Sequence, residues 1–324
     1  MRRMKLSFGN PQLECLSKVA AFVIALACFS SPMAAQQKGQ KTFASREDAS
    51  QALFMAAKSN DENAMLDILG PDGKEIVSSG DPIQDANNRA NFAKQFDQMH
   101  RLRNEPDGST TLYIGAENWP VPIPLMHAKG MWYFDTQAGK NEILFRRVGQ
   151  NEISAIMVCE QLAVAQKEYF TTQHRQYAQK LFSDEGQHNG LYWKVAAGEA
   201  PSPIGPLVAE AEAYGHGKET TTSPYRGYYF HMLTAQGKNA PGGDMSYLVA
   251  GKMTGGFAFV AYPAEYRSSG VMTFIVDKQG IVYQKDLGKD TVALAKAMTK
   301  YEPDGTWRRA KDLPEESVAA KPAK

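Results

Sequence analysis

Eight glycines fall between Gly242 and Gly288, and such a glycine-rich stretch could bind phosphate through its backbone amides. A phosphate-binding loop leads from a strand directly into the first turn of a helix, where free amides and the helix dipole meet the anion. Here each glycine cluster leads into another run of strand character, and neither GxGxxG nor GxxxxGKS/T occurs. The stretch GHGKET lacks the first glycine and has no hydroxyl residue after Lys218. The glycines therefore predict turns between strands, and we expect no cofactor.

Metal-binding and nucleophilic chemistry also lack a recognisable spacing. None of the six histidines is paired at i,i+3 or i,i+4, and the zinc motif HExxH is absent. No GxSxG motif marks a nucleophile elbow, and the 35 Asp and Glu residues do not single out an acid–base pair. Cys159, in the apolar run IMVCEQL, is predicted to be a small buried hydrophobic residue. We therefore expect no metal site and name no catalytic residue.

Aromatic residues give the best remaining indication of a binding site. Ten of the fourteen tyrosines lie between Tyr192 and Tyr301, concentrated in LYW, SPYRGYYF and YPAEY. On a twisted sheet, side chains of this kind pack in the core or across neighbouring strands. The alternative is a partly exposed platform for a glycan, a peptide or a partner strand. The residues of this candidate binding surface are Trp193, Tyr225, Arg226, Tyr262, Glu265 and Tyr266.

The elements before residue 139 predict a small α+β domain. Ser45 with Asp48 three residues later is a capping box, and it begins a helix in SREDASQALFMAAKSN. Two further helices are predicted, in DENAMLDIL and in DANNRANFAKQFDQMHRL. The runs STTLYIGAENW and GMWYFDT indicate strands, and the prolines of WPVPIPLM restrict that segment to an edge or an extended loop. This order of elements resembles the nuclear transport factor two-like cone fold.

A long helix is predicted to follow, from Gly139 through about forty residues without proline. Its apolar stripe steps by three, four or seven residues from Leu144 to Tyr177. Gly149 lowers helix stability by about 1 kcal/mol relative to alanine, so a break or hinge could occur there. We place a domain boundary near this residue.

The C-terminal half predicts an antiparallel sheet. After a loop-rich segment with a short helix around Leu207 to Tyr214, five runs of strand character alternate with glycine-bearing turns, namely GYYFHMLTAQG, MSYLVAGKM, GFAFVAYP, GVMTFIVD and GIVYQKDLG. DKQG fits a tight hairpin connection. KDTVALAKAMTKY predicts a last helix that begins at Asp290. The predicted fold class is α+β: N-terminal helices with a small antiparallel sheet, then a long helix packed on a second antiparallel sheet.

The N-terminus has the pattern of a secretory signal. Its basic start is followed by eleven mostly apolar residues from Val19 to Phe29 and by small residues up to Ala35. This run is shorter than the roughly 20 residues that span a bilayer, so we expect no membrane span in the mature form. The predicted location is the periplasm or the medium. The alternatives are a retained N-terminal anchor and a lipoprotein, because Ala25-Leu26-Ala27-Cys28 approximates a lipidation site.

Length, charge and cysteine content limit the number of domains, the kind of partner and the possible disulfides. The 324 residues, 43% of them hydrophobic, suffice for two domains that each bury a core. The predicted division is a signal at 1–35, an α+β domain at 36–138, a helix-and-sheet domain at 139–309 and a disordered tail at 310–324. Without residues 1–35, which hold four of the 36 basic and one of the 35 acidic residues, the net charge is −2, so nucleic acid is not an expected partner. Cys159 is then the single remaining cysteine, so no intrachain disulfide forms.

The chain resembles an exported bacterial family, the domain of unknown function numbered 2950. The resemblance rests on GQNEISAI, AQKEYF, GLYW, SPIGPL, PYRGYYFHMLTAQG, APGGDMSY, GFAFVAYPAEYRSSGVMTFIV and VYQKDLG, and it covers nearly the whole mature chain. It implies no established activity. The long helix and the following sheet are also similar to pilin and pseudopilin globular domains. The chain lacks the apolar, glutamate-bearing N-terminal helix with which pilins assemble into filaments.

These observations favour an exported binding or assembly module of the cell envelope, whose partner is an envelope protein or a glycan. The alternative is an envelope hydrolase that acts on glycan or peptide, and a filament or secretion subunit is a third possibility. A cleft with convergent polar groups and perturbed carboxylates would indicate the enzyme. A shallow aromatic surface or an open sheet edge would indicate the binding module.

Overall fold

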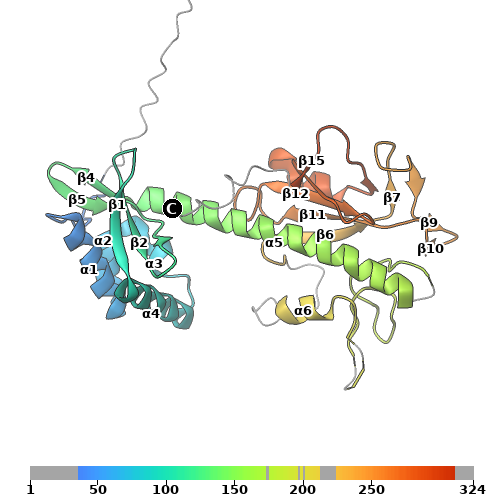
Figure 1. Ribbon diagram of the computed structural model, residues 1–324, viewed down its shortest axis with the longest axis horizontal. Coiled ribbons are helices and arrows are strands. Elements are labelled where there is room, and N and C mark those ends of the chain that lie inside the picture. The colour runs from blue at the N-terminus through green and yellow to red at the C-terminus, as the bar shows by residue number, and fades with distance from the viewer. Residues whose placement is uncertain (1–35, 173–174, 196–197, 200, 212–223, 311–324) are drawn as a thin grey trace, which may run out of the picture. The chain divides into compact units, whose positions relative to one another are not determined.

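The computed structural model describes residues 36–172, 175–195, 198–199, 201–211 and 224–310. The predicted signal at 1–35 and nearly all of the predicted tail lie outside these residues. The helices are α1 (Arg46–Lys58), α2 (Glu62–Leu69), α3 (Lys74–Val77), α4 (Pro82–Gln98), α5 (Thr136–Thr172), α6 (Gly205–Ala211) and α7 (Thr291–Lys296) (Figure 1). The predicted α+β class is confirmed, with N-terminal helices and a small sheet before a long helix and a second sheet.

Short side-chain caps begin the first helices. The Ser45 hydroxyl accepts a hydrogen bond from the Asp48 amide, 3.0 Å away, as the capping box predicts. Asp61 caps α2 in the same way, and Asp81 caps α4 with Pro82 in its first turn. The predicted third helix was too long at its C-terminal end, because α4 ends at Gln98 and the residues from His100 onward form a strand.

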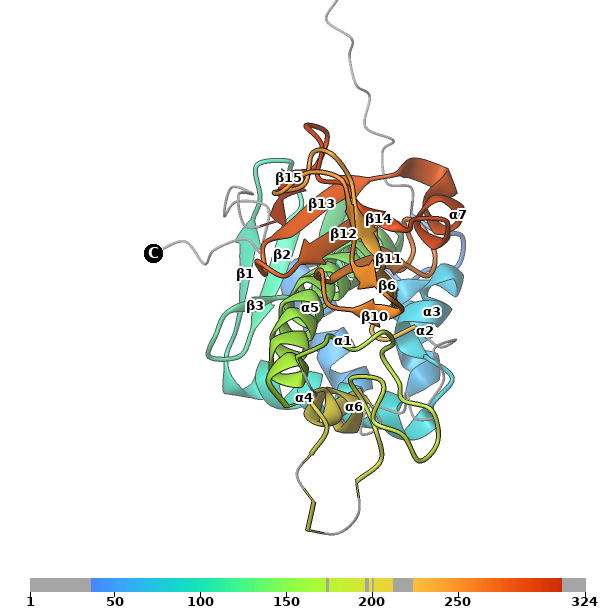
Figure 2. The ribbon, with the colours of Figure 1, turned by 90° about the vertical axis from the view of Figure 1, so that its right-hand side faces the viewer.

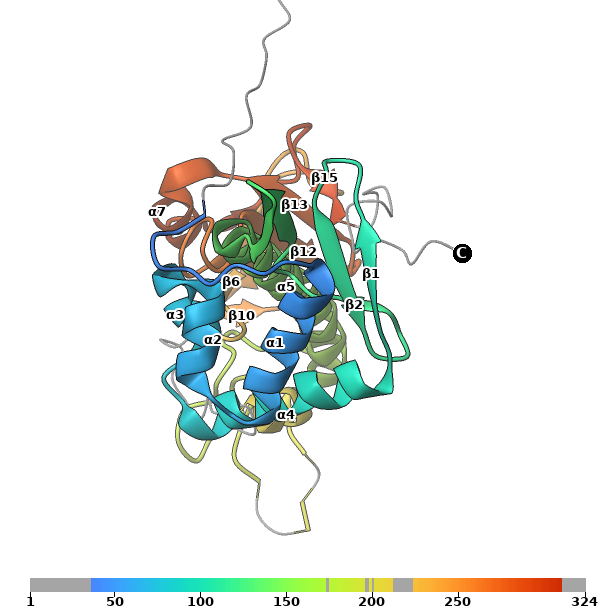
Figure 3. The same cartoon turned by 90° about the vertical axis from the view of Figure 1, so that its left-hand side faces the viewer.

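The N-terminal sheet has the strands β1 (His100–Asn104), β2 (Thr110–Ile114), β3 (Trp119–Pro120), β4 (Leu125–Ala128) and β5 (Met131–Phe134). Their order is β1-β2-β4-β5, with β3 paired to β2, and all pairs are antiparallel. Helices α1 and α4 lie beside the β1–β2 hairpin (Figure 3). Leu112, Leu125 and Phe134 are fully buried between the sheet and these helices. The expectation of an edge or loop at residues 119–126 was wrong at Leu125, which opens an inner strand.

Helix α5 runs without interruption through Gly149, so no break occurs at that residue. Its N-terminal turns pack on the N-terminal region, where Arg146 Nη1 donates to the Pro120 carbonyl at 2.7 Å. From Ala155 to Tyr169 its buried apolar residues belong to the core of the second sheet. The helix is shorter than predicted, since it ends at Thr172 and the Tyr177 amide donates to the Met253 carbonyl instead.

The described residues of the C-terminal region form ten strands. They are β6 (Tyr228–Leu233), β7 (Ala235–Gln236), β8 (Met245–Ser246), β9 (Leu248–Val249), β10 (Lys252–Met253), β11 (Ala258–Pro263), β12 (Met272–Asp277), β13 (Val282–Asp286), β14 (Lys300–Tyr301) and β15 (Arg308–Arg309). The main sheet is antiparallel in the order β15-β13-β12-β11-β6. The predicted last helix was wrong at its end, because α7 stops at Lys296 and Lys300–Tyr301 pairs in parallel with β7.

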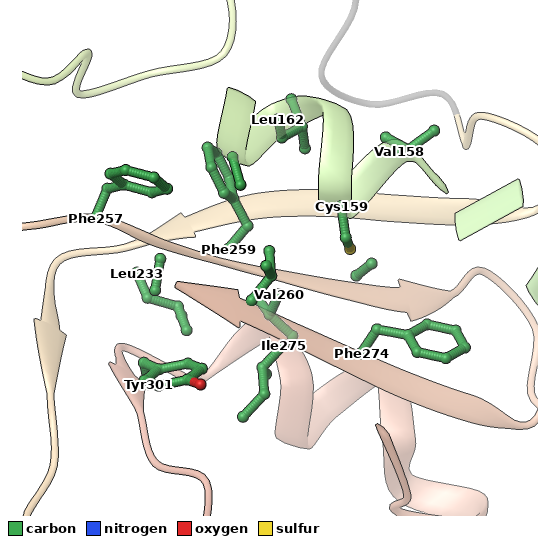
Figure 4. Packing of buried hydrophobic residues seen from close by; sticks show 14 of the residues in the cluster. Val158, Cys159, Leu162, Leu233, Phe257, Phe259, Val260, Phe274, Ile275 and Tyr301 are labelled. Carbon is green, nitrogen blue, oxygen red and sulfur yellow. The ribbon is translucent and has the colours of Figure 1, made fainter. Parts of the chain in front are cut away.

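Both faces of this main sheet are covered. Cys159 and Leu162 of α5 lie on one side next to Phe259, and Ile275 and Tyr301 lie on the other side (Figure 4). Helix α7 packs against β11 on the side opposite α5 (Figure 2). All six residues of β11 are therefore buried. The glycines between the strands sit in turns as predicted, and the Gly280 amide donates to the Asp277 carbonyl at 2.9 Å.

No helix among the described residues combines the length and the apolar character that a bilayer-spanning segment needs.

Candidate binding site at the β6 edge

A tight turn leads into β6 and fixes the start of the candidate site. Tyr225 and Tyr228 exchange two backbone hydrogen bonds, of 2.8 and 3.0 Å, around Arg226 and Gly227. These two turn residues have φ values of 46° and 77°, the signature of a type I′ hairpin turn. Positive φ is costly for a long side chain, so Arg226 is held there by the turn. The turn places the Arg226 guanidinium 5.7 Å from the centre of the Tyr225 ring.

The loop between β11 and β12 lies against this turn. The Ala264 amide donates to the Gly227 carbonyl at 2.9 Å, and the Tyr266 hydroxyl donates to Asp286 at 3.1 Å. Arg267 has a φ of 66° and lies 5.4 Å from the centre of the Tyr266 ring. Two Arg–Tyr pairs therefore flank the same end of the main sheet.

Helix α5 anchors this loop from one side. Asn151 donates to the Ser269 carbonyl at 2.9 Å, and one oxygen of Glu152 accepts from the amides of Val271 and Met272 at 2.8 and 3.0 Å. Gly270 is required at its position, because a Cβ there would lie 2.1 Å from the Tyr228 hydroxyl oxygen. The α5 side chains therefore hold the loop through its backbone and do not use the loop side chains.

The structure brings most of the predicted surface residues together. Tyr225, Arg226, Glu265 and Tyr266 all belong to the turn and the loop just described. Tyr262 is different: it is 5% exposed, its ring lies 5.6 Å from that of Tyr229, and burial raises the pKa of its hydroxyl. The prediction of an exposed platform is therefore wrong at Tyr262.

Trp193 lies elsewhere. Its ring stacks on His188 at 4.4 Å and meets the edge of Tyr169 at 6.4 Å. Tyr169 follows Asn151, the loop anchor, by 18 residues on α5. At the rise of an α-helix this separation is about 27 Å. Trp193 is therefore not part of the site formed by the turn and the loop.

The outer edge of β6 adds groups that the sequence did not single out. Strand β6 is the last strand of the main sheet. The amide and carbonyl of Tyr228 point away from β11, since both bond to Tyr225. Along an antiparallel strand this direction alternates, so Phe230, Met232 and Thr234 also point their backbone groups outward.

As far as the described residues go, both ends of this edge are occupied and its middle has no partner. At Thr234 the amide donates to the Thr299 carbonyl at 3.2 Å, and the carbonyl accepts from the Tyr247 amide at 2.8 Å. Within the described ranges no hydrogen bond reaches the amide or the carbonyl of Phe230 or Met232 on the outer side. Two donors and two acceptors are therefore available between two closed ends.

The side chains that border the open edge are apolar or neutral. Met232 has its sulfur 3.8 Å from the Gln166 amide nitrogen on α5, so Met232 and Phe230 share the α5 face. Tyr229 and His231 lie on the opposite face, where the His231 Nε2 donates to the Met298 carbonyl at 3.1 Å. Burial lowers the pKa of His231, so this imidazole is neutral at pH 7. The edge therefore carries no formal charge.

Shallow grooves among the described residues include two that lie elsewhere. One, of about 490 Å³, lies between α1 and β1 and is lined by residues including Arg46, Asp48 and His100. The other, of about 410 Å³, lies between α5 and the start of α6, beside Met157 and Val164. Neither groove is lined by Asp277, a carboxyl whose pKa is raised by burial. The groove between α1 and β1 does contain Glu47, but a backbone hydrogen bond and one from Arg46 lower the pKa of this carboxyl, which is opposite to the shift that a general acid needs.

Among the residues that the structure describes, no group of three or more His, Cys, Asp or Glu side chains could hold a metal ion. Cys159 is buried between α5 and the sheet, and burial raises the pKa of its thiol. A buried thiol of this kind is inert.

The sequence holds one signal for Phe230 and Met232, the lack of charge around them, and it is not sufficient by itself. The sequence of β6, YYFHML, has no Lys, Arg, Asp or Glu, whereas that of β1, HRLRN, has two arginines. Lack of charge is common to central strands and open edges, so the signal gains meaning only once the strand order is known.

Comparison with curated proteins and with solved structures finds no match. A family model described as "Protein of unknown function (DUF2950)" matches residues 40–310. This range includes every helix and strand named above. The chain belongs to the DUF2950 family.

Proposed function

We propose that the protein is an exported binding module of the cell envelope that contacts a protein partner at the β6 end of its main sheet. The open middle of the β6 edge is the observation that supports this function most directly. Unpaired backbone amides and carbonyls on an edge strand are a template for another polypeptide. A glycan would use the half-buried rings of Tyr225 and Tyr266 but would leave these four backbone groups without strand partners.

The neighbouring loops support the same function. Tyr225, Arg226, Tyr266 and Arg267 surround the start of β6. Tyrosine and arginine are the residue types enriched where proteins bind one another. Since Asn151 and Glu152 of α5 anchor the loop, its aromatic contacts are pre-organised for binding.

The hydrolase alternative has weaker support. Burial raises the pKa of Asp277, as it would for a catalytic acid, but this carboxyl is 3% exposed. Burial, and after it the charge of Asp277, also raise the pKa of the neighbouring Tyr247 and Tyr301 hydroxyls. The Oδ1 of Asp277 accepts from the Gln279 amide at 2.9 Å in the hairpin turn. This arrangement suits a structural turn better than a site that substrate must enter.

Export is part of the proposal and rests on the N-terminal sequence. We expect the mature chain to begin near Gln36 and to be recovered from the envelope or the medium. Cell fractionation and mass measurement of the mature N-terminus test this expectation. A mature form that begins with a lipid-modified Cys28 would establish the lipoprotein alternative, and recovery of the full chain from the cytoplasm would contradict export.

Photo-cross-linking in the cells that make the protein tests the binding function. A photoreactive phenylalanine analogue replaces Tyr266 in one variant and Ile83, which is 75% exposed in the N-terminal region, in a control variant. We expect a protease-sensitive adduct from position 266 and none from position 83. A protease-resistant adduct that glycan-degrading enzymes remove would show that the partner is a glycan. Equal adducts from both positions would overturn the proposed site.

A further inference from the structure

The edge strands of the two sheets are protected in different ways. Strand β1 carries Arg101 and Arg103, and β15 consists of Arg308 and Arg309. Strand β5 is covered, because Phe43 and Trp132 exchange two backbone hydrogen bonds of 2.9 and 2.8 Å. Charged side chains and covering segments are the usual means by which proteins prevent edge-to-edge pairing. Strand β6, an edge of the main sheet, differs from these strands. Its middle has no charged side chain and is not covered by any described segment that hydrogen-bonds to it.

The two closed ends set the length of what can bind. Tyr225 occupies the pairing position beside Tyr228, and Thr299 and Tyr247 occupy those beside Thr234. Five residues of β6 remain between these ends, a length of about 17 Å at the rise of an antiparallel strand. A longer strand would collide with Tyr225. The same argument disfavours a second copy of β6, since each copy would bring its own Tyr225 against the other.

The two faces of β6 set the chemistry of the occupant. Side chains that point toward α5 would meet Phe230 and Met232, and those that point the other way would meet Tyr229 and the neutral His231. A charged side chain on either face would lose water without gaining an ionic partner on β6. The occupant is therefore apolar or aromatic on both faces, with β-branched residues favoured.

We propose that β6 binds one short, apolar, extended segment of a partner polypeptide, about five residues long, which pairs with Phe230 and Met232 as a sixth strand of the main sheet. Four backbone hydrogen bonds hold the segment, and Tyr225 and Thr299 fix where it begins and ends. This inference rests on the proposed function, because it assigns the chemistry of the partner at the same site.

A pair of variants at Phe230 separates strand pairing from side-chain contact. Phe230→Ala removes the ring and keeps the outward amide. Phe230→Pro removes both the ring and the amide hydrogen. In the wild type the Phe230 amide does not bond to β11, so the proline leaves the hydrogen bonds between β6 and β11 intact. Equal denaturation midpoints for the two variants verify that both fold alike. For the test, a displayed library of random seven-residue peptides is selected on the wild-type protein.

We expect selected peptides with alternating β-branched and aromatic residues, whose affinity falls by at least tenfold for Phe230→Pro relative to Phe230→Ala. Amide exchange in the full chain gives a second measurement. The Phe230 and Met232 amides should exchange fast in the free protein and slowly with the selected peptide bound.

Three results would overturn the inference. The first is peptides that bind both Phe230 variants equally, and the second is a library that yields no specific binder. The third is slow exchange at Phe230 and Met232 in the free protein: if it depends on concentration, a second copy covers the edge, and if it does not, the chain itself does. A cross-link from position 266 that survives in Phe230→Pro would preserve the proposed function while refuting strand addition.

Discussion

The two sheets of this protein differ in how they are covered. The N-terminal sheet packs one face on α1, α2 and α4, and its other face displays Arg101 beside the Tyr113 ring at 4.7 Å. The main C-terminal sheet is covered on both faces, and its inner strand β11 has no exposed residue. A sheet with both faces covered can meet another molecule only at its edges or its ends. The difference therefore directs attention to β6 in the second sheet.

The edges of the two sheets differ as well. Strand β1 has four exposed residues of five and two arginines, whereas β6 has no exposed residue and no formal charge. Cationic edge residues oppose pairing with another chain. An uncharged edge beside two Arg–Tyr pairs allows such pairing, which is the physical basis of the proposed function.

The largest effect should come from the doubly covered core. Phe259→Ala removes a fully buried ring from β11, and we expect it to lower the free energy of unfolding by about 3–5 kcal/mol. Trp193 and Trp307 contact this core, whereas Trp132 packs in the N-terminal one. In variants that keep a single tryptophan, the denaturant midpoint of the fluorescence change should fall when the tryptophan is Trp307 and should stay unchanged when it is Trp132. Phe96→Ala is the matched control, with the opposite pattern.

An equal shift at both tryptophans in Phe259→Ala would show that the two regions unfold as one cooperative unit. The comparison between the two sheets would then describe their structure but not their stability.

A second prediction concerns the arginines of β1. Replacing Arg101 and Arg103 with valine removes the charge that protects this edge and raises its β-propensity. We expect self-association to increase several-fold, measured by light scattering against protein concentration at low salt. The double lysine variant is the control and should remain as monodisperse as the wild type. Unchanged scattering for the valine variant would mean that charge is not what distinguishes β1 from β6.

Local signals in the sequence were sufficient for much of the fold. The Ser45 cap and the DKQG turn each act within a few residues of chain, and both formed as predicted. The long proline-free stretch formed one helix, which is shorter than predicted. The errors occurred where tertiary contacts decide the outcome. His100 to Leu102 continue a helical pattern but pair with β2, and Tyr177 continues the stripe of α5 but bonds to Met253.

The candidate site shows the same limit. Clustering of aromatic residues in the sequence pointed to Tyr225 and Tyr266. In the structure these two residues do lie together, because the strand order places their two connections at the same end of the sheet. Clustering could not tell that Tyr262 faces inward or that Trp193 packs on Tyr169. The open groups of Phe230 and Met232 depend on which strand is last in the sheet, and no local pattern encodes that position.

A third prediction uses the two glycines of α5. A Cβ at Gly149 would meet no atom within 4 Å, so Gly149→Ala should raise the free energy of unfolding by about 1 kcal/mol through helix propensity alone. At Gly139 a Cβ would lie 2.8 Å from Ile123. Gly139→Ala should therefore lower stability despite the same gain in propensity. Urea midpoints measure both, and stabilisation at both positions would show that the contact with Ile123 is easily relieved.

The smallest effect is expected at Asp277, a buried carboxyl of the second sheet. Burial raises its pKa above the usual value near 3.8, so the folded state holds its proton more tightly than the unfolded state does. As pH rises through this window the unfolded chain ionises first, and wild-type stability falls until the folded pKa is passed. Asp277→Asn cannot ionise, and its side-chain oxygen still accepts from the Gln279 amide. We therefore expect the variant to be more stable than the wild type near neutral pH, by less than the gain at Gly149. The two proteins should be equally stable at low pH, where Asp277 is protonated in both the folded and the unfolded state. Urea midpoints from about pH 3 to about pH 8 check this, and an advantage that stays constant across the range would mean that the charge of Asp277 is not its cause.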